Sequence, residues 1–235
     1  MIIYGLNGTG GTSFTDCWHQ NIVKTLPTTA VTFGISSGDA KDTAAGDGAR
    51  TVKLKMLDAN YNYAEETLSM NGQTEVDTTG TYLRFLGGEV LTAGTELDNA
   101  GIIYVYDASD TVTSGVPQTA TKIFGRMAIG ENRFLDGSFT VPAGKTWSIK
   151  RLMVFGNDAT TTEKALTAQF LVREYGSVFK TIAIPGFAGG DAGGQQYFDW
   201  TPIVGLSFSA KTDFKLQSKQ SAAMLWGCII EIDEW

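Results

Sequence analysis

Histidine and cysteine are scarce in this chain, and their scarcity excludes several kinds of site. His19 is the only histidine among 235 residues, which excludes a cluster of histidine metal ligands and any Ser-His-Asp triad elsewhere. The two cysteines, Cys17 and Cys228, are too few for a structural zinc site within one chain. We expect free thiols, with a disulfide between them as the alternative.

Positive charge and long apolar runs are also lacking. The chain has 25 acidic against 18 basic residues and a net charge of −7. It has no basic stripe of the kind that neutralises phosphates, so we expect no nucleic-acid partner. No apolar run reaches the roughly 18 residues of a membrane span. Residues 1–4, Met-Ile-Ile-Tyr, do not read as a secretory leader, so we expect synthesis in a cytoplasm and no membrane partner.

No stretch has a sustained helical period with caps. A short helix in residues 12–24 or 157–166 is the alternative. Period-two patterns bounded by turn residues are frequent, and the clearest is residues 46–76. There Val52, Leu54 and Met56 alternate with Lys53 and Lys55, and a turn at residues 58–60 follows. This pattern predicts a β-hairpin.

Strand patterns recur along the rest of the chain. In the second half, residues 147–155 are predicted to be a strand with one face formed by Trp147, Ile149, Arg151, Met153 and Phe155. Roughly twelve short strands separated by turns are typical of an all-β antiparallel sandwich or jelly roll. We predict two tandem sandwiches, at residues 29–110 and 118–235, after an extended N-terminal arm at residues 1–28. A single large sandwich is the alternative.

Candidate catalytic and ligand-binding residues are few. Asp39, Asp42 and Asp47 share the small-residue loop 36–49 and form a candidate calcium site, although the spacing favours a solvated loop. Glu65 and Glu66 are adjacent, so on a strand they point to opposite faces and make a poor acid–base pair. The glycine-rich run 5–11 lacks the Lys-Ser/Thr ending of a phosphate loop. We therefore predict no catalytic residues, no cofactor and no enzymatic activity.

Aromatic residues are the remaining candidates. Their density is typical of sandwich cores or subunit contacts, and a sugar-binding platform is the alternative. The residues that we expect at interfaces are Tyr4, Phe14, Trp18, Phe187, Tyr197, Trp200 and Trp235.

Several motifs resemble those of a family of virion structural proteins of tailed phages, many from marine and cyanobacterial hosts. The motifs are Pro27-Thr28-Thr29-Ala30, the loop Ser36–Arg50, the hairpin Leu57–Gly72, the strand Tyr82–Gly94, FTVPAGKTWSIKRLMVF at 139–155 and FLVREYGSVFKT at 170–181. The resemblance covers most of the chain after residue 25. It departs at Met56, where the family has glycine, and in the N-terminal arm.

The resemblance implies a particle component located in the virion. We expect a capsid decoration, cement or head-fibre subunit, trimeric, that contacts the major capsid protein or other virion proteins. A tail or receptor-binding component that binds a host glycan is the alternative, and a glycan-active enzyme on a β-sandwich is a third class.

Overall fold

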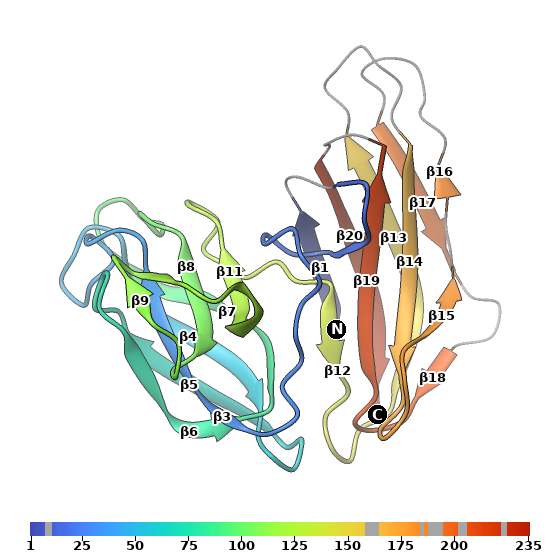
Figure 1. Ribbon diagram of the computed structural model, residues 1–235, viewed down its shortest axis with the longest axis horizontal. Coiled ribbons are helices and arrows are strands. Elements are labelled where there is room, and N and C mark those ends of the chain that lie inside the picture. The colour runs from blue at the N-terminus through green and yellow to red at the C-terminus, as the bar shows by residue number, and fades with distance from the viewer. Residues whose placement is uncertain (8–10, 158–164, 184–185, 188–194, 202–205, 222–224) are drawn as a thin grey trace. The chain divides into compact units, whose positions relative to one another are not determined.

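The protein folds as two compact units, both built from β-strands (Figure 1). The computed structural model describes residues 1–7, 11–157, 165–183, 186–187, 195–201, 206–221 and 225–235. Unit 2 comprises Lys24–Phe134, and unit 1 comprises Met1–Val23 together with Leu135–Trp235. Within the described ranges the only helical element is one 3-10 turn, η1 (Ala120–Lys122), and the paired strands run antiparallel. The expected all-β antiparallel class is confirmed.

The division into units differs from the boundaries predicted at residues 28 and 110–118. The polar segment 107–121 connects strands of one sheet, because β8 (Ile103–Asp107) pairs with β11 (Ile123–Met127). Most of the expected arm lies in unit 1, where β1 (Ile2–Asn7) pairs with β20 (Leu225–Glu234). Polar, turn-rich composition marks loops within a β domain as well as linkers between domains.

Unit 2 contains a four-stranded sheet in the order β11-β8-β3-β6, here called sheet C, and a three-stranded sheet in the order β5-β4-β7, here called sheet D. A short β10-β9 ribbon accompanies them. The further strands are β3 (Val31–Ser37), β4 (Ala49–Leu57), β5 (Tyr63–Ser69), β6 (Val76–Tyr82), β7 (Arg84–Ala93), β9 (Val112–Thr113) and β10 (Val116–Pro117).

The predicted hairpin at residues 46–76 is confirmed as β4 and β5. Their register runs from Thr51 opposite Ser69 to Leu57 opposite Tyr63. Val52, Leu54 and Met56 of β4 enter one hydrophobic core shared by sheets C and D, whose other members include Phe33, Ile35, Val105, Phe124 and Met127. Each such side chain contributes about 1.5–3 kcal/mol by its removal from water. The other face of β4 carries Lys53 and Lys55, which lie 3.1 and 3.6 Å from Glu89 Oε1.

The chain passes from sheet C to sheet D at Leu83, between β6 and β7. The sequence predicts one continuous strand there, with Tyr82 and Arg84 on the face opposite Leu83 and Phe85. Instead all four side chains are buried, with exposed fractions of 4–7%. The predicted continuity is wrong, because the strand is interrupted at Leu83 where the chain changes sheets.

Unit 1 contains sheet A, in the order β1-β20-β13-β17 with β18 also on β13, and sheet B, in the order β12-β19-β14-β15 with β16 on β14 and β2 on β19. The further strands are β2 (Thr15–Asp16), β12 (Ser138–Thr140), β13 (Trp147–Asn157), β14 (Leu166–Arg173), β15 (Lys180–Ala183), β16 (Gly186–Phe187), β17 (Gln195–Trp200), β18 (Leu206–Phe208) and β19 (Asp213–Gln220).

A register shift in β13 reverses the side-chain alternation predicted for residues 147–155. Trp147 and Ile149 are buried, as are Leu152 and Val154, because the pairing with β20 shifts between Ile149 and Arg151. An extra residue in one strand of a pair turns all following side chains to the other face. Arg151, Met153 and Phe155 therefore lie on the opposite face from Trp147, contrary to the prediction.

The segment after β1 is fixed to its own unit by a buried polar network. The Asp16 carboxylate accepts a hydrogen bond from Lys215 Nζ at 2.8 Å and from Gln217 Nε2 at 2.6 Å, both on β19. Residues 12–24 contain no helix, and most of the other candidate helical range, 157–166, lies outside the described residues. Among the helices of the described chain, none has the length and apolar character needed to cross a membrane.

Candidate functional site

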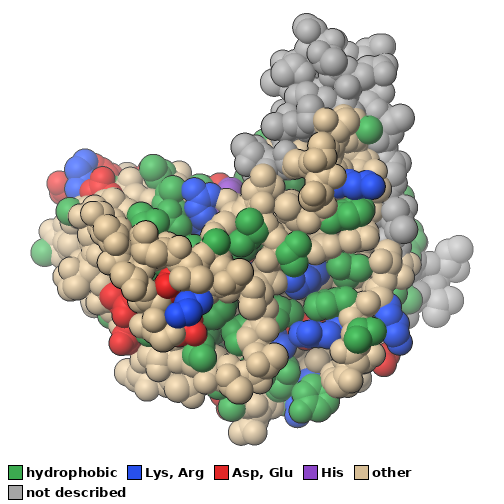
Figure 2. Space-filling view, in the orientation of Figure 1, with side chains coloured by type: hydrophobic (Ala, Val, Ile, Leu, Met, Phe, Trp, Pro, Cys, Tyr) green, Lys and Arg blue, Asp and Glu red, His purple; other side chains and the backbone are tan. Residues whose placement is uncertain are grey.

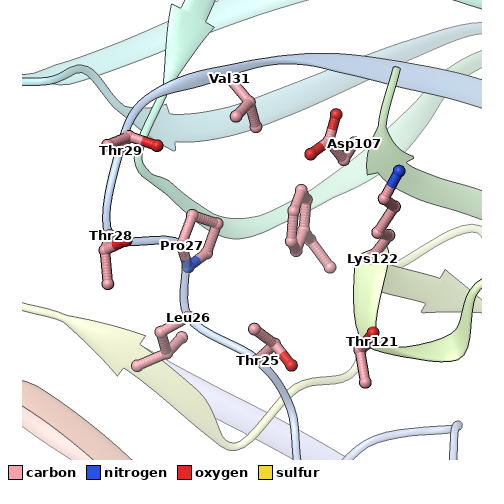
Figure 3. A pocket seen from close by; sticks show the side chains of 10 residues that line it. Thr25, Leu26, Pro27, Thr28, Thr29, Val31, Asp107, Thr121 and Lys122 are labelled. Carbon is pink, nitrogen blue, oxygen red and sulfur yellow. The ribbon is translucent and has the colours of Figure 1, made fainter. Parts of the chain in front are cut away.

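Unit 2 has an open pocket of about 290 Å³ beside the start of β3 (Figure 3). Its residues come from the segment before β3, the end of β8, η1 and β11. They are Thr25, Leu26, Pro27, Thr28, Thr29, Val31, Asp107, Thr121, Lys122 and Phe124. In Figure 3, Leu26, Pro27 and Thr28 lie on one side, with Thr121 and Lys122 across from them.

Arg84 holds one wall of this pocket in place. Its Nη1 donates to the carbonyl oxygens of Pro27 at 2.6 Å and of Leu83 at 2.8 Å. The guanidinium carbon lies 5.5 Å from the centre of the Tyr61 ring, a distance at which a cation–π interaction stabilises the side chain. Arg84 is 4% exposed, so its role is to position the backbone of residues 25–29.

The floor and mouth of the pocket have different chemistry. Phe124 is buried and its ring centre lies 5.0 Å from that of Phe33, so the floor is part of the core. At the mouth, Lys122 Nζ donates to the carbonyl oxygen and the hydroxyl of Ser109 at 3.2 and 3.0 Å. Asp107 Oδ1 accepts from Ser109 N at 2.9 Å. The pocket thus offers apolar walls and threonine hydroxyls to a small group, and it is at the lower end of ligand-site volumes.

The three aspartates of the loop 36–49 do not converge on one point. Asp42 is fully buried, and its carboxylate accepts from Ser37 Oγ (2.5 Å), Ala49 N (2.6 Å), Ala100 N (2.9 Å) and Gly101 N (2.9 Å). Asp39 accepts from Lys41 N, and Asp47 from Thr95 Oγ1. In the described part of the chain no three His, Cys, Asp or Glu side chains are grouped to hold a metal ion. Asp42 instead joins three backbone segments.

Glu65 and Glu66 have separate partners, as expected for opposite faces of a strand. Glu65 accepts from Tyr63 Oη at 2.5 Å. Glu66 accepts from Thr79 N, Gly80 N and the Tyr82 hydroxyl. Burial raises the pKa of Glu66, but these hydrogen bonds outweigh burial and leave it below its ordinary value. A carboxyl group held in this way is stabilised as the anion and is a poor general acid.

The candidate interface residues have different surroundings. Tyr4 and Trp235 are 39% and 61% exposed, and Phe14 and Trp200 are partly exposed. Trp18 is 1% exposed, and its Nε1 donates to the Ile22 carbonyl at 2.9 Å, so it presents almost no surface to a partner. The side chains of Phe187 and Tyr197, like most of the loop 186–196, lie outside the described residues.

The outward side of sheet A is more apolar than the sequence pattern indicates. Three adjacent strands place Tyr4 opposite Ile229, and Ile229 opposite Met153. Tyr4, Ile229 and Met153 are exposed or partly exposed. Their inward-facing neighbours Ile230, Leu152 and Val154 are buried. We call this surface the sheet A outer face, and its apolar residues are Ile2, Tyr4, Leu6, Met153, Phe155 and Ile229. Sequence reasoning missed it because the register shift in β13 was not visible.

An ion-pair cluster lies at one end of this face. Arg151 donates to both carboxylate oxygens of Asp199, at 2.8 and 2.6 Å, and lies 3.6 Å from Glu231 Oε1. The hydrogen bond from Arg151 lowers the pKa of Asp199, and the same bond raises the pKa of Arg151. The charges are exposed, so their contribution to stability is small, but they border the apolar residues as a polar rim borders an interface core.

The outer side of sheet B is polar by comparison. Arg173 pairs with Asp213 at 2.5 Å and also lies over the Phe179 ring at 4.6 Å. Gln169 Nε2 donates to Gln217 Oε1 at 2.7 Å. Figure 2 shows positively charged side chains among hydrophobic ones over β14 and β19. The two outward surfaces of unit 1 therefore differ in chemistry.

Comparison with known proteins gives distant structural similarities. No family model and no curated protein matches the chain. A structure described as "CBM4 structure and function" is 10% identical over 57% of this chain and 72% of its own, with a TM-score of 0.24. The infectious bursal disease virus Gx strain structure is 9% identical over 98% and 71% of the two chains, with a TM-score of 0.28. The cowpea mosaic virus top component is 5% identical over 87% and 82%, with a TM-score of 0.24. At such TM-scores the likeness carries no argument about function.

Proposed function

We propose that this chain is a non-enzymatic structural protein of a phage virion. In this proposal it is a capsid decoration, cement or head-fibre subunit, with each unit a two-sheet sandwich. The observation that carries the proposal is the sheet A outer face, where three adjacent strands expose apolar side chains beside a polar rim. A sheet with apolar residues on both sides gains stability when a second surface covers it.

The use of the charged side chains also supports a structural role. The side chains of Asp42 and Arg84 form hydrogen bonds with backbone groups. Asp16 and Lys215 form an ion pair with each other. The motifs that resemble phage virion proteins include the hairpin Leu57–Gly72 and the strand Tyr82–Gly94. Both contribute to unit 2, so the resemblance lies in the scaffold. The proposed partners are the major capsid protein or other virion proteins, and copies of this chain in a trimer.

The test is to locate the chain on purified particles by cryo-electron microscopy. We expect density on the capsid, with the sheet A outer face covered by a neighbouring subunit. Density on the tail alone would contradict the decoration role, and a sheet A outer face left open to solvent would contradict the proposed docking surface.

Substitutions provide a second test of the same face. Tyr4→Lys with Met153→Lys places two charges among its apolar residues, and we expect a loss of at least tenfold in the amount of chain bound to particles. The control is Leu97→Lys, which replaces an apolar residue of unit 2 that is 78% exposed. Both variants should retain the wild-type circular dichroism spectrum. Equal binding by both variants would show that the face is not the docking surface.

The pocket of unit 2 favours one alternative, a tail or receptor-binding component that holds a host glycan. Its combination of apolar wall and threonine hydroxyls suits a sugar ring. A glycan array would show selective binding, which Pro27→Ala with Thr121→Ala should weaken. Turnover of a host polysaccharide would instead contradict the non-enzymatic role.

A further inference from the structure

Unit 1 is assembled from two pieces of chain, residues 1–23 and 135–235, which are separated in sequence by the whole of unit 2. The joint between the pieces consists of strand pairing and buried polar contacts. β1 pairs with β20 over six residues, β2 pairs with β19, and Asp16 is bound by Lys215 and Gln217. The only two cysteines of the chain lie one on each side of this joint.

Cys17 and Cys228 lie close together in space that is left by the missing side chains of Gly5 and Gly137. Gly5 is the register partner of Cys228, and a Cβ placed on Gly5 would be 2.9 Å from Cys17 Sγ. A Cβ placed on Gly137 would be 2.9 Å from Cys17 Cβ and 3.0 Å from Cys228 Sγ. Both cysteines are free and fully buried, and their thiols are hydrogen-bonded to each other.

The backbone on each side of the pair is well fixed. Cys17 N donates to Leu216 O at 2.9 Å, and Gly137 N donates to Cys17 O at 2.8 Å. Cys228 lies within β20, between β1 and β13. A disulfide needs its two Cβ atoms about 4 Å apart, and two thiols in hydrogen-bond contact need little backbone movement to reach that separation.

We propose that Cys17 and Cys228 form an oxidisable pair whose disulfide closes the joint between the two pieces of unit 1 covalently. The oxidant is a low-molecular-weight disulfide such as glutathione disulfide. One cysteine thiolate attacks it, forms a mixed disulfide and releases one glutathione thiolate. The second cysteine thiolate then attacks the protein sulfur and releases the second glutathione. The two thiols together lose two protons and two electrons, and one glutathione disulfide is reduced to two glutathiones.

The closed fold makes this reaction slow. Burial raises the pKa of the Cys17 thiol, and the hydrogen bond with Cys228 raises it further, so little of the reactive thiolate is present. Oxidation therefore requires residues 11–23 to lift from sheet B, or takes place while the chain folds. Once formed, the disulfide is protected by the same burial. The inference concerns unit 1 alone and does not depend on the proposed virion role.

The experiment is to refold the purified chain from urea in buffers of increasing glutathione disulfide and then to count thiols and measure intact mass. We expect the wild type to lose both thiols and two hydrogen atoms without gaining glutathione. Cys17→Ala and Cys228→Ala should instead keep one thiol or gain one glutathione each. Two thiols retained under oxidising conditions, or two glutathiones gained, would overturn the proposal.

A second measurement keeps the test independent of refolding yield. Native protein treated with diamide, a thiol oxidant, should reach the same cross-linked mass, more slowly. Its thermal midpoint, read by tryptophan fluorescence, should rise by roughly 5–10 °C over the reduced form, and the single variants should show no such rise. A cross-linked form with a lower midpoint than the reduced form would contradict its role in closing the joint.

Discussion

The carboxylate of Asp42 illustrates how a buried acid can be used for structure. It accepts four hydrogen bonds, from Ser37 at the end of β3, from Ala49 at the start of β4 and from residues 100–101 before β8. Replacing it by asparagine would put an amide N–H against backbone N–H donors, which leaves buried donors unsatisfied.

We expect Asp42→Asn to lower the free energy of unfolding of unit 2 by about 2–4 kcal/mol. Urea unfolding followed by far-ultraviolet circular dichroism would measure it. The control is Asp39→Asn, because Asp39 accepts a backbone hydrogen bond from Lys41 N at an exposed site. A similar effect of both substitutions would contradict the role assigned to Asp42.

The ionisation of Glu66 makes the stability of unit 2 depend on pH in the acid range. Its pKa is lowered in the folded chain, since the hydrogen bonds from Tyr82, Thr79 and Gly80 outweigh burial. Its stabilising contribution is therefore complete above the unfolded pKa of about 4.3 and is lost as the pH falls through the lower folded pKa.

Tyr82→Phe removes one of these donors, so the pKa of Glu66 moves up and less stability is gained from its ionisation. We expect the variant to be less stable by about 1 kcal/mol at neutral pH and to lose less stability than the wild type on acidification. Tyr63→Phe, which removes the donor to the exposed Glu65, should leave the acid profile unchanged. The measurement is the urea midpoint at a series of pH values.

At the scale of strands, the register shift in β13 decides which residues form the core of unit 1. Trp147 and Ile149 precede the shift, and Leu152 and Val154 follow it, yet all four are buried. Lys150 is the extra residue between them. Its side chain is exposed and lies 2.7 Å from Asp233.

Deletion of Lys150 should therefore leave the core residues of β13 in place. Without the extra residue, Ile149 is followed directly by Arg151, and Trp147, Ile149, Leu152 and Val154 share one face of a regularly alternating strand. We expect this deletion to keep the cooperative unfolding of unit 1 by tryptophan fluorescence, whereas deletion of Met153, which turns Val154 to the outer face, should abolish it. Lys150→Ala, which loses a surface ion pair, should change stability by less than about 1 kcal/mol.

The same strand shows what sequence patterns can and cannot predict. Alternation correctly gave the buried face of β4, because Val52, Leu54 and Met56 all point into the same core. It failed in β13 and at Leu83, where a bulge and a change of sheet are set by distant partners. The pocket was also beyond prediction, because Pro27, Asp107 and Lys122 are brought together by the fold and not by spacing.

At the scale of the molecule, unit 2 is continuous in sequence and unit 1 is not. Unit 2 has its own hydrophobic core, and every strand of sheets C and D pairs with strands from residues 24–134. All five tryptophans lie in unit 1, at positions 18, 147, 200, 226 and 235, so tryptophan fluorescence reports on the unfolding of unit 1 alone.

We expect residues 24–134 expressed alone to fold, with a β-type circular dichroism spectrum and cooperative thermal unfolding. Residues 135–235 expressed alone should not, because they lack β1 and the Asp16 contacts to β19. An unfolded 24–134 fragment would contradict the independence of unit 2, and a cooperatively folded 135–235 fragment would contradict the need for the N-terminal piece.

The pairing of β1 with β20 also has a consequence for synthesis on the ribosome. Residues 2–7 pair with residues 226–231, so β1 is translated long before its partner β20. At ~5–20 residues per second, that delay is roughly 10–40 s. Throughout it, the uncharged segment Ile-Ile-Tyr-Gly-Leu-Asn has an open edge, while unit 2 can already fold. The nascent chain is therefore most exposed to aggregation at β1, where a holding chaperone would have the greatest effect on yield.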